Sequence, residues 1–441
     1  MESPVSSVRR RSLRTASHAG AFVPLLTLFF SACGPTAPPS PPGLAVSPQR
    51  PVLTQGDSLR LTATVGGHGV ESGSVIHWTS LNSGVATVSS LGTVRAVAVG
   101  VAMIVATLQS DADTIPIVVQ PPALRSLASA RGFVMGTSVD VNALRLDAQF
   151  QQQLALQYNG VTSEWAMKFG PIHPGAAQYN FVEADRLVSF AQQNGMTVHG
   201  HTLVWGEGLP GWVTNGKFTK TQLLQVLHTH IATVVGRYKG KIASWDVVNE
   251  VVDDTAPLRH TLWLQVIGPE YIDSAFVWAH QADPAAKLYL NENHAEGSGP
   301  KADAVLALAQ GLRGRGIPID GVGFQAHFTL TPPPPAAADL QANLARFAAA
   351  GLSVRVSEMD VRVADAAPAG ALDQEATIFH DMLDACLRLG TRCTGFTSWG
   401  FTDKYSWIPK FYPGYGRALP FDASYQSKPA DAALVTRLQQ P

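Results

Sequence analysis

Residues 242–250 read IASWDVVNE, a short apolar run that ends in a carboxylic acid. A run of this kind is typical of a β-strand, and similar runs lie on both sides of it with helical patterns between them. The predicted strands are 133–139, 160–169, 197–205, 242–249, 287–291, 321–326, 353–357 and 394–399, and the predicted helices include 179–193, 219–238, 299–314 and 340–350. Eight strands that alternate with helices predict an α/β fold, a (β/α)8 TIM barrel over residues 127–441.

The segment before the barrel has a different composition. Residues 44–120 are rich in Val, Thr, Ser and Gly, and apolar positions alternate with polar ones, as in 59–65, 75–80, 85–88 and 103–108. Short strands at this spacing predict a small all-β sandwich. The stretches WTS (78–80), VATVS (85–89), GTVRA (92–96) and GVA (100–102) resemble the bacterial Ig-like domains of group two. We expect this domain to be a spacer, and the alternative is that it binds carbohydrate or the cell wall.

The N-terminus has the features of an export signal. An arginine cluster at 9–14 is followed by the mostly apolar residues 19–32, a run too short to span a bilayer. Residues 30–33 (FSAC) resemble a bacterial lipoprotein cleavage box. Residues 1–32 are therefore predicted to be removed and Cys33 to carry a lipid that anchors the exported protein in the cell envelope. The alternatives are an ordinary signal peptide, which would give a secreted protein, and a twin-arginine signal.

Two proline-containing segments separate these parts. Residues 33–43 form a Pro-rich stretch that should be extended and semi-rigid, and residues 121–126 begin with Pro121 and Pro122. The first segment would hold the Ig-like domain away from the membrane, and the second would link it to the barrel.

The composition limits the classes of partner. The chain has 441 residues, of which 46% are hydrophobic and 15% charged, so it can bury a large core. A formal net charge of -1 gives no attraction toward nucleic acid and suits a neutral polysaccharide at least as well. We expect a monomer without cofactor or metal. Cys386 and Cys393 are close in sequence, so in an exported protein they predict one disulfide, and their spacing without a nearby histidine is poor evidence for zinc.

The ends of the predicted strands carry the chemistry. The active site of a TIM barrel lies at the carboxyl ends of its strands. Acids, histidines and tryptophans gather at these ends: Glu164, Lys168, His199, His201, Trp205, Asp246, Asn249, Glu250, Gln325, His327, Glu358, Asp360 and Trp399. Such a set suits a sugar site, because carboxylates supply acid–base chemistry, indoles cover apolar sugar faces and polar groups bind hydroxyls.

Glu250 and Glu358 are the best pair of acids, because each follows a predicted strand. Hydrolysis of a glycosidic bond needs one carboxyl group to protonate the leaving oxygen and a second to stabilise or attack the anomeric carbon. A single glutamate at a barrel rim is more often part of a salt bridge. Two of them in these positions favour a glycoside hydrolase.

Several ordered motifs make this prediction more specific. Residues 245–250 (WDVVNE), 357–360 (SEMD), 201–205 (HTLVW), 323–327 (GFQAH) and 399–407 (WGFTDKYSW) resemble glycoside hydrolase family ten, the endo-β-1,4-xylanases. The resemblance runs from about residue 127 to the C-terminus. That family also often has a disulfide just before its last strand, where Cys386 and Cys393 stand.

The resemblance implies a retaining double displacement on xylan. Glu358 would be the nucleophile, and Glu250 the acid/base residue, protonated at the start, with about 5–5.5 Å between the carboxyl groups. Asn249 would bind the sugar 2-hydroxyl, Asp360 and His327 would orient Glu358, and His201 would pair with Asp246. The implied subsite residues are Glu164, Lys168, Trp205, Gln325, Trp399 and Trp407.

Three positions depart from the family pattern. Trp165 stands where the family usually has Asn, and Gly206-Glu207-Gly208 replaces His-Ser-Gln after the third strand. Residues 291–294 read NENH instead of the usual Asn-Asp-Tyr-Asn. We hypothesise that Trp165 fills or re-aims the space left by Gly206 and Gly208, so that the glycone subsite and the substrate preference change.

Three other functions fit part of the pattern. One is a glycosidase of the same mechanism acting on a decorated or different β-glycan, and another is a surface glycan-binding protein with a decayed site. The third is a metal-dependent hydrolase that uses His199 and His201, although no complementary set of ligands follows them.

Overall fold

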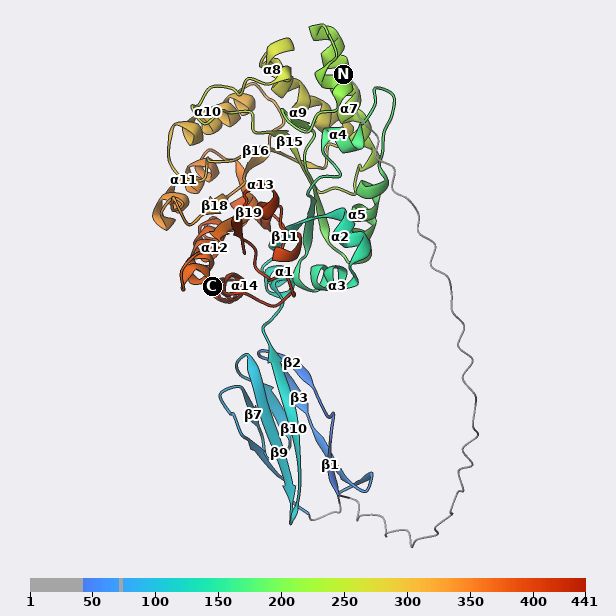
Figure 1. Ribbon diagram of the computed structural model, residues 1–441, viewed down its shortest axis with the longest axis vertical. Coiled ribbons are helices and arrows are strands. Elements are labelled where there is room, and N and C mark those ends of the chain that lie inside the picture. Colours follow the sequence, from blue (N-terminus) through green and yellow to red (C-terminus); the bar gives the residue numbers. More distant parts are fainter. Residues whose placement is uncertain (1–42, 71–73) are drawn as a thin grey trace, which may run out of the picture.

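The computed structural model describes residues 43–70 and 74–441, in which a small β-structure lies beyond one end of a helix-ringed barrel (Figure 1). The predicted signal segment, Cys33 and residues 33–42 of the predicted linker lie outside the described residues. Within the described part of the chain, no helix combines the length and apolar character needed to cross a membrane.

The barrel is a closed parallel sheet. Its strands are β11 (Val134–Val139), β12 (Gly160–Ser163), β13 (Thr197–Gly200), β15 (Ser244–Asn249), β16 (Lys287–Glu292), β17 (Gly321–Phe324), β19 (Ser353–Ala364) and β20 (Cys393–Ser398). Each pairs in parallel with the next, and β20 returns to pair with β11. The predicted TIM barrel is confirmed, and its strands share one carboxyl end.

Three predicted strands differ from the observed strands by more than two residues or are divided in two. The prediction 160–169 is too long, because β12 ends at Ser163 and the short helix α4 (Phe169–Ile172) follows. The segment 197–205 is divided into β13 and β14 (Val204–Trp205). The prediction 353–357 is too short, because β18 (His327–Thr329) and β21 (Tyr415–Gly416) pair with the continuation of β19.

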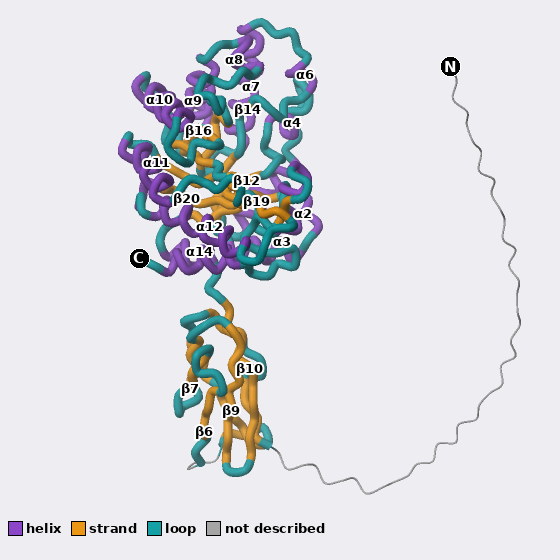
Figure 2. Tube along the Cα trace, turned by 60° about the vertical axis from the view of Figure 1, so that its left-hand side comes forward, coloured by secondary structure: helices purple, strands orange, loops and turns teal. Residues whose placement is uncertain are grey.

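Helices surround the strands, as the purple and orange segments of Figure 2 show. They are α1 (Leu124–Ala130), α2 (Val141–Leu146), α3 (Ala148–Gln157), α5 (Val182–Gln193), α6 (Gly211–Thr214), α7 (Lys220–Arg237), α8 (Leu262–Val266), α9 (Glu270–Ala282), α10 (Pro300–Gly314), α11 (Ala337–Ala349), α12 (Ala371–Leu387), α13 (Ile408–Phe411) and α14 (Pro429–Gln439), with 3-10 turns η1 (Gly390–Arg392) and η2 (Asp403–Tyr405). The start of α7 is typical: Thr219 and Gln222 form a capping box. Leu223 and Leu227, four residues apart, bury one face of α7 against the barrel.

Side chains of the strands alternate between two environments. In β19, Val354 and Val356 belong to the apolar core, whereas Arg355 and Ser357 form hydrogen bonds across the barrel interior. This alternation follows from the two-residue period of a strand. The barrel therefore contains a polar axis inside an apolar shell, and this axis ends at the site.

The N-terminal region is the β-rich Ig-like structure that the sequence predicts. Its strands are β1 (Leu44–Ser47), β2 (Val52–Thr54), β3 (Ser58–Arg60), β4 (Thr62–Val65), β5 (His68–Gly69), β6 (His77–Ser80), β7 (Ala86–Val88), β8 (Thr93–Ala96), β9 (Gly100–Leu108) and β10 (Asp111–Gln120). The predicted strand 59–65 is wrong as a single element, because Leu61 turns inward between β3 and β4, which pair in different sheets. Gly92 has a φ of +77° and lies under the Trp78 ring, where a Cβ would collide.

Candidate active site

Glu250 and Glu358 lie at the same end of the barrel. Glu250 directly follows β15 and has a φ of +54°, a left-handed conformation that costs a non-glycine residue about 1–3 kcal/mol. Its backbone N–H donates to the carbonyl of Asn291 at 2.9 Å, which helps to hold this conformation. Glu358 lies within β19 and is 5% exposed. The strained backbone at Glu250 is the kind of feature that functional sites retain.

A chain of amide side chains connects the two carboxyl groups. Gln325 Nε2 donates to Glu250 Oε1 at 3.0 Å and approaches Asn249 Oδ1 at 3.4 Å. Asn291 Nδ2 donates to the same Asn249 oxygen at 2.9 Å and to Glu358 Oε1 at 2.6 Å. The oxygen of Asn249 is thus occupied, which leaves its N–H groups for a ligand. Both carboxyl groups belong to one hydrogen-bonded cluster at the barrel mouth.

Among the described residues, the hydrogen-bond donors to the Glu250 carboxyl group are uncharged. Trp205 Nε1 donates to Oε2 at 3.1 Å, and the amide of Gln325 donates to Oε1. The carbonyl of Trp205 in turn accepts a bond from Trp263 Nε1 at 2.8 Å, which fixes the strand that carries the indole.

Cationic side chains surround Glu358. Burial alone would raise the pKa of Glu358, but the charges of His201, His327 and Lys168 outweigh it and lower the pKa. His327 Nε2 lies 3.2 Å from Glu358 Oε2, and His201 Nδ1 lies 3.8 Å from Oε1. Glu358 is therefore a carboxylate at neutral pH, which is the form of a nucleophile.

His327 is held between two acids. Its Nδ1 lies 3.0 Å from Asp360 Oδ2, and Trp407 Nε1 donates to the same oxygen at 2.8 Å. Burial would lower the pKa of His327, but Asp360 and Glu358 raise it to about 10. At neutral pH the ring is an imidazolium that donates to both carboxylates. The contacts predicted among Asp360, His327 and Glu358 are present.

The predicted contact between His201 and Asp246 is also present. His201 Nδ1 lies 2.9 Å from Asp246 Oδ2, and His199 Nε2 approaches the same oxygen at 2.9 Å. Burial would raise the pKa of Asp246, but the two histidines lower it. Both histidines that the metal-site alternative would use are thus engaged with one acid. The described residues contain no group of three or more His, Cys, Asp or Glu side chains arranged to hold a metal ion.

Aromatic rings and a lysine line the wall beside β12 and β14. Lys168 Nζ lies 4.7 Å from the ring centroid of Trp205, 5.2 Å from that of Trp165 and 5.8 Å from that of Trp399. Burial lowers the pKa of Lys168, and burial raises the pKa of Glu164 to about 7. The structure therefore brings the predicted subsite residues Lys168, Trp205 and Trp399 together with Trp165, whose side chain is 53% exposed.

The two glycines of the third-strand segment have different neighbours. A Cβ on Gly208 would lie 3.6 Å from the Trp165 ring and 3.7 Å from the Trp205 ring. A Cβ on Gly206 would instead collide with Thr261 at 2.6 Å. The hypothesis is therefore wrong for Gly206, whose space Thr261 occupies, whereas Trp165 does lie against Gly208.

Residues after β16 form a separate cluster. Lys301 Nζ bonds to Asn293 Oδ1 at 2.6 Å and to Asp254 Oδ1 at 2.9 Å, and His294 lies 3.2 Å from the same Asp254 oxygen. Glu292 is fully buried and accepts the N–H of Val252, and burial raises its pKa to about 8. These side chains support the loop after β15.

Sequence reasoning overlooked two residues of the site. Asn291 bridges Asn249 and Glu358, and Ser357 Oγ donates to Asn291 Oδ1 at 2.6 Å, which fixes the amide orientation. Both are polar residues at the last position of a predicted strand, which is the pattern that could have identified them. The predicted disulfide between Cys386 and Cys393 is present, with 5.4 Å between the Cα atoms.

Comparisons with known proteins agree with this geometry. Residues 123–437 match Glycosyl hydrolase family 10, and residues 42–119 match the Bacterial Ig-like domain (group 2). The chain is 40% identical over 325 residues to endo-1,4-beta-xylanase B of Thermotoga neapolitana, covering 73% of this chain and 93% of the relative. It is 39% identical to endo-1,4-beta-xylanase B of Humicola insolens, covering 71% of this chain and 86% of that relative.

Solved structures show the same likeness. Xylanase 10B from Thermotoga petrophila in complex with xylobiose has a TM-score of 0.70 and 40% identity, covering 73% of this chain and 98% of that one. The endo-1,4-beta-xylanase XylE of Penicillium canescens has a TM-score of 0.70 and 34% identity, covering 72% and 97%. This chain belongs to glycosyl hydrolase family 10 and is a glycoside hydrolase with an N-terminal Ig-like domain.

Proposed function

We propose that this enzyme hydrolyses β-1,4-xylan with retention of the anomeric configuration. The family and the printed activities of its relatives, which are endo-1,4-β-xylanases, support the substrate class. The single observation that carries the mechanism is the contrast between the two acids. His201, His327 and Lys168 lower the pKa of Glu358, whereas the hydrogen-bond donors to the Glu250 carboxyl group are an indole and an amide.

In the first step, Glu250 donates its proton to the glycosidic oxygen while Glu358 attacks the anomeric carbon. The bond to the leaving sugar breaks, and a glycosyl ester forms on Glu358. The free amide N–H of Asn249 would donate to the 2-hydroxyl of the sugar, an interaction that strengthens in the transition state.

In the second step, Glu250 is a carboxylate and removes a proton from water. The resulting oxygen attacks the anomeric carbon, and the ester bond to Glu358 breaks. Two inversions give net retention, and both acids return to their starting states. The loss of negative charge on Glu358 in the ester is what lets Glu250 change from acid to base.

Trapping of the intermediate tests this mechanism. A 2-deoxy-2-fluoro xylobioside with a good leaving group should label the wild-type enzyme, and mass spectrometry should find the sugar on the peptide that contains Glu358. The variant Glu358→Gln should remain unlabelled. A product that is first released as the opposite anomer, as followed by NMR, would contradict retention. Complete inactivity of the wild type toward xylan and other β-glycans would instead favour a glycan-binding protein.

We further propose that Trp165 changes the glycone subsite. Its ring is half-exposed, lies against Gly208 and stacks near Lys168, so it offers an apolar face to a sugar. The hydroxyl contacts of the usual family residues are absent at these positions. A weaker preference for unbranched xylo-oligosaccharides follows, with a relative gain on decorated xylan or another β-glycan.

The variant Trp165→Asn tests the subsite proposal. We expect the ratio of kcat/KM on linear xylo-oligosaccharides to that on decorated xylan to rise about tenfold, the effect of about 1.4 kcal/mol. Leu156→Asn on the outer face of α3 is a control of similar exposure, 51% against 53%. An unchanged ratio in Trp165→Asn would refute the proposal.

We also propose that the protein is exported and carries a lipid on Cys33. The sequence FSAC at 30–33 supports this, and the disulfide between Cys386 and Cys393 fits an oxidising compartment. Expression with labelled palmitate should label the wild type and not Cys33→Ala. Equal labelling of both, or of neither, would contradict lipidation at this cysteine. We also expect a monomer, so light scattering of the Cys33→Ala protein should give the mass of one chain.

A further inference from the structure

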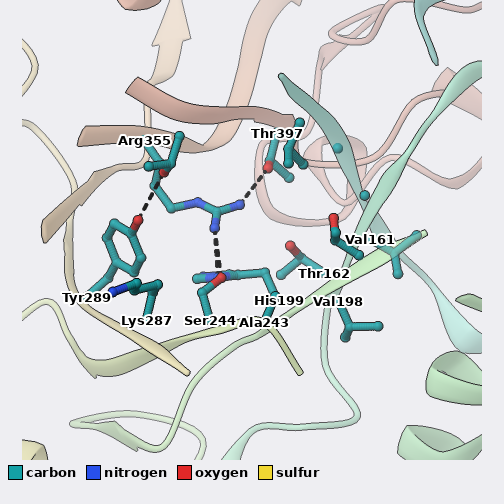
Figure 3. A pocket seen from close by; sticks show the side chains of 15 residues that line it. Val161, Thr162, Val198, His199, Ala243, Ser244, Lys287, Tyr289, Arg355 and Thr397 are labelled. Atoms are coloured by element: carbon teal, nitrogen blue, oxygen red, sulfur yellow. Dashed lines mark hydrogen bonds between the residues drawn. The ribbon is translucent and has the colours of Figure 1, made fainter. Parts of the chain in front are cut away.

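A cavity lined by both apolar and polar residues lies inside the barrel at the end opposite the active site. Thr197, Ser244 and Lys287, which line it, stand at the first positions of β13, β15 and β16. Figure 3 shows the guanidinium of Arg355 extending across it toward His199. Arg355 is 6% exposed, so a permanent cation lies within the barrel, and the mechanism proposed above does not use it.

In the part of the chain that the structure describes, the hydrogen-bond partners of the guanidinium are uncharged groups. Its Nη1 donates to His199 Nδ1 at 2.8 Å and to Ser244 Oγ at 3.2 Å, and its Nη2 donates to Thr397 Oγ1 at 3.2 Å. Burial first, and then the charge of Arg355, lower the pKa of His199 to about 4. Burial of a cation costs free energy, and the negative charge of Asp246, on the far side of His199, offsets part of this cost.

The arginine determines which nitrogen of His199 carries the proton. A guanidinium has donors only, so His199 Nδ1 must accept and the ring proton must lie on Nε2. That nitrogen lies 2.9 Å from Asp246 Oδ2 without the alignment of a hydrogen bond, so His199 presents its protonated nitrogen, and not a lone pair, to the acid. Without the arginine, a neutral His199 could place the proton on Nδ1, toward Ser244, and turn a lone pair toward Asp246.

Asp246 carries this effect to the active site. The same Oδ2 atom accepts from His201 Nδ1 at 2.9 Å, and this nitrogen is 3.8 Å from Glu358 Oε1. We define His199, Asp246 and His201 as the histidine relay. A lone pair of His199 aimed at Asp246 would repel the acid from its place beside His201 and disturb the charge next to the nucleophile.

We propose that Arg355 is a positioning residue that acts on Glu358 through the histidine relay. This inference rests on the proposed role of Glu358 as the nucleophile. It assigns a function to the end of the barrel that substrate does not reach. The charged and titratable groups that face His199 are Arg355 from β19, Asp246 from β15, Tyr289 from β16 and His201 beyond the end of β13. Lys287 at the cavity edge is paired with Asp320 at 2.9 Å.

The position of the His199 proton can be measured in the unreacted enzyme. Full-length protein labelled with 15N in its histidines should give imidazole shifts for a neutral ring protonated on Nε2 from pH 5.5 to 8. His199→Gln identifies the signal by its loss. A proton on Nδ1 would overturn the proposal, even if a retaining intermediate is trapped on Glu358. The two proposals can therefore fail independently.

Kinetics give the second test. We expect Arg355→Met to lower kcat/KM on an aryl β-xylobioside about tenfold at pH 8 and about twofold at pH 5. Burial lowers the pKa of His199 most and the charge of Arg355 second, so without the arginine the ring takes up a proton more readily at the lower pH and keeps a protonated nitrogen toward Asp246. Arg355→Lys should restore most of the activity, and Arg346→Met on α11 is the surface control. A loss that is equal at both pH values, or no loss, would overturn the proposal. If Arg355→Met does not fold, the shift measurement decides.

Discussion

Glu358 and Glu250 are the same residue type at the same end of the barrel, yet their neighbours differ in charge. On the β19 side, His327 Nε2 and His201 Nδ1 lie 3.2 Å and 3.8 Å from Glu358 oxygens. On the β15 side, an indole and an amide are the donors to Glu250. The comparison teaches that the barrel scaffold brings the two acids to one end and that the residues around them make their electrostatic environments different.

The origin of this difference is the pair of elements next to each acid. Glu358 belongs to β19, which lies between β17 and β20. The continuation of β19 pairs with the extra strand β18, whose first residue is His327. Glu250 follows a strand next to β14, which ends in Trp205. A histidine already held by Asp360 supplies charge, whereas an indole N–H supplies a donor without charge.

The largest expected effect comes from removing Glu358, the proposed nucleophile. Glu358→Gln keeps the size of the side chain but has one accepting oxygen in place of the two that face Asn291 and His327, and it cannot form a stable glycosyl ester. We expect kcat on xylo-oligosaccharides to fall on the order of 10⁴-fold or more, because the whole displacement route is lost. Steady-state rates with every leaving group should fall together. A variant that retains more than a few per cent of kcat would contradict the assignment.

Removal of the acid/base residue should have a more selective effect. Glu250→Gln should lower glycosylation by about 10²–10⁴-fold for substrates whose leaving group needs a proton. A dinitrophenyl leaving group needs no proton, so its glycosylation should be nearly unchanged and a burst of dinitrophenol should appear. If Glu250→Gln and Glu358→Gln respond to the leaving group in the same way, the comparison of the two acids fails.

Much of this site could be predicted from sequence. The strand order placed Glu250 and Glu358 at one rim, and the family motifs supplied His327 and Asp360 beside Glu358 and the pair His201 and Asp246. These predictions succeed because parallel strands share a carboxyl end, so residues at corresponding strand positions must meet. The residue contacts within the β18–β19 pairing also follow once the register is known.

Other features depend on register and on inward orientation, which a single sequence does not reveal. Asn291 was visible only as part of a departing motif, and its bridge to Glu358 requires the two strands on which they stand to have the observed stagger. Arg355 was passed over inside a short apolar strand. Gly206 looked like vacated space, whereas Thr261 comes from a distant loop to fill it. Long-range packing decided each of these cases.

His327 links the charge around Glu358 to pH. Its charge is one of those that lower the pKa of Glu358, after that of His201 and against the larger effect of burial. His327→Asn should therefore move the acidic limb of the kcat/KM profile to higher pH by about one unit, equivalent to about 1.4 kcal/mol. An acidic limb that stays in place would show that His327 does not set the charge of Glu358.

The stability of the protein gives an independent check on His327. Its pKa is raised in the folded state to about 10, so its charged form contributes stability fully below the unfolded value near 6.5 and loses it as pH rises through about 10. The free energy of unfolding of the wild type should exceed that of His327→Asn most at pH 6. The two curves should approach each other between pH 7 and pH 10, as measured by urea denaturation.

The smallest expected effect concerns Trp407, which reaches Glu358 only through Asp360 and His327. Trp407 Nε1 donates to Asp360 Oδ2 at 2.8 Å, and Trp407→Phe removes this bond while keeping an aromatic ring beside His327. Asp360 then has one donor fewer, so its hold on the imidazolium changes only slightly. We expect kcat to fall about threefold and the acidic limb to move by less than about half a unit. If Trp407 instead stacks directly on a sugar, KM should rise in Trp407→Phe while the acidic limb stays fixed. Trp407 would then have no influence on the pKa of Glu358.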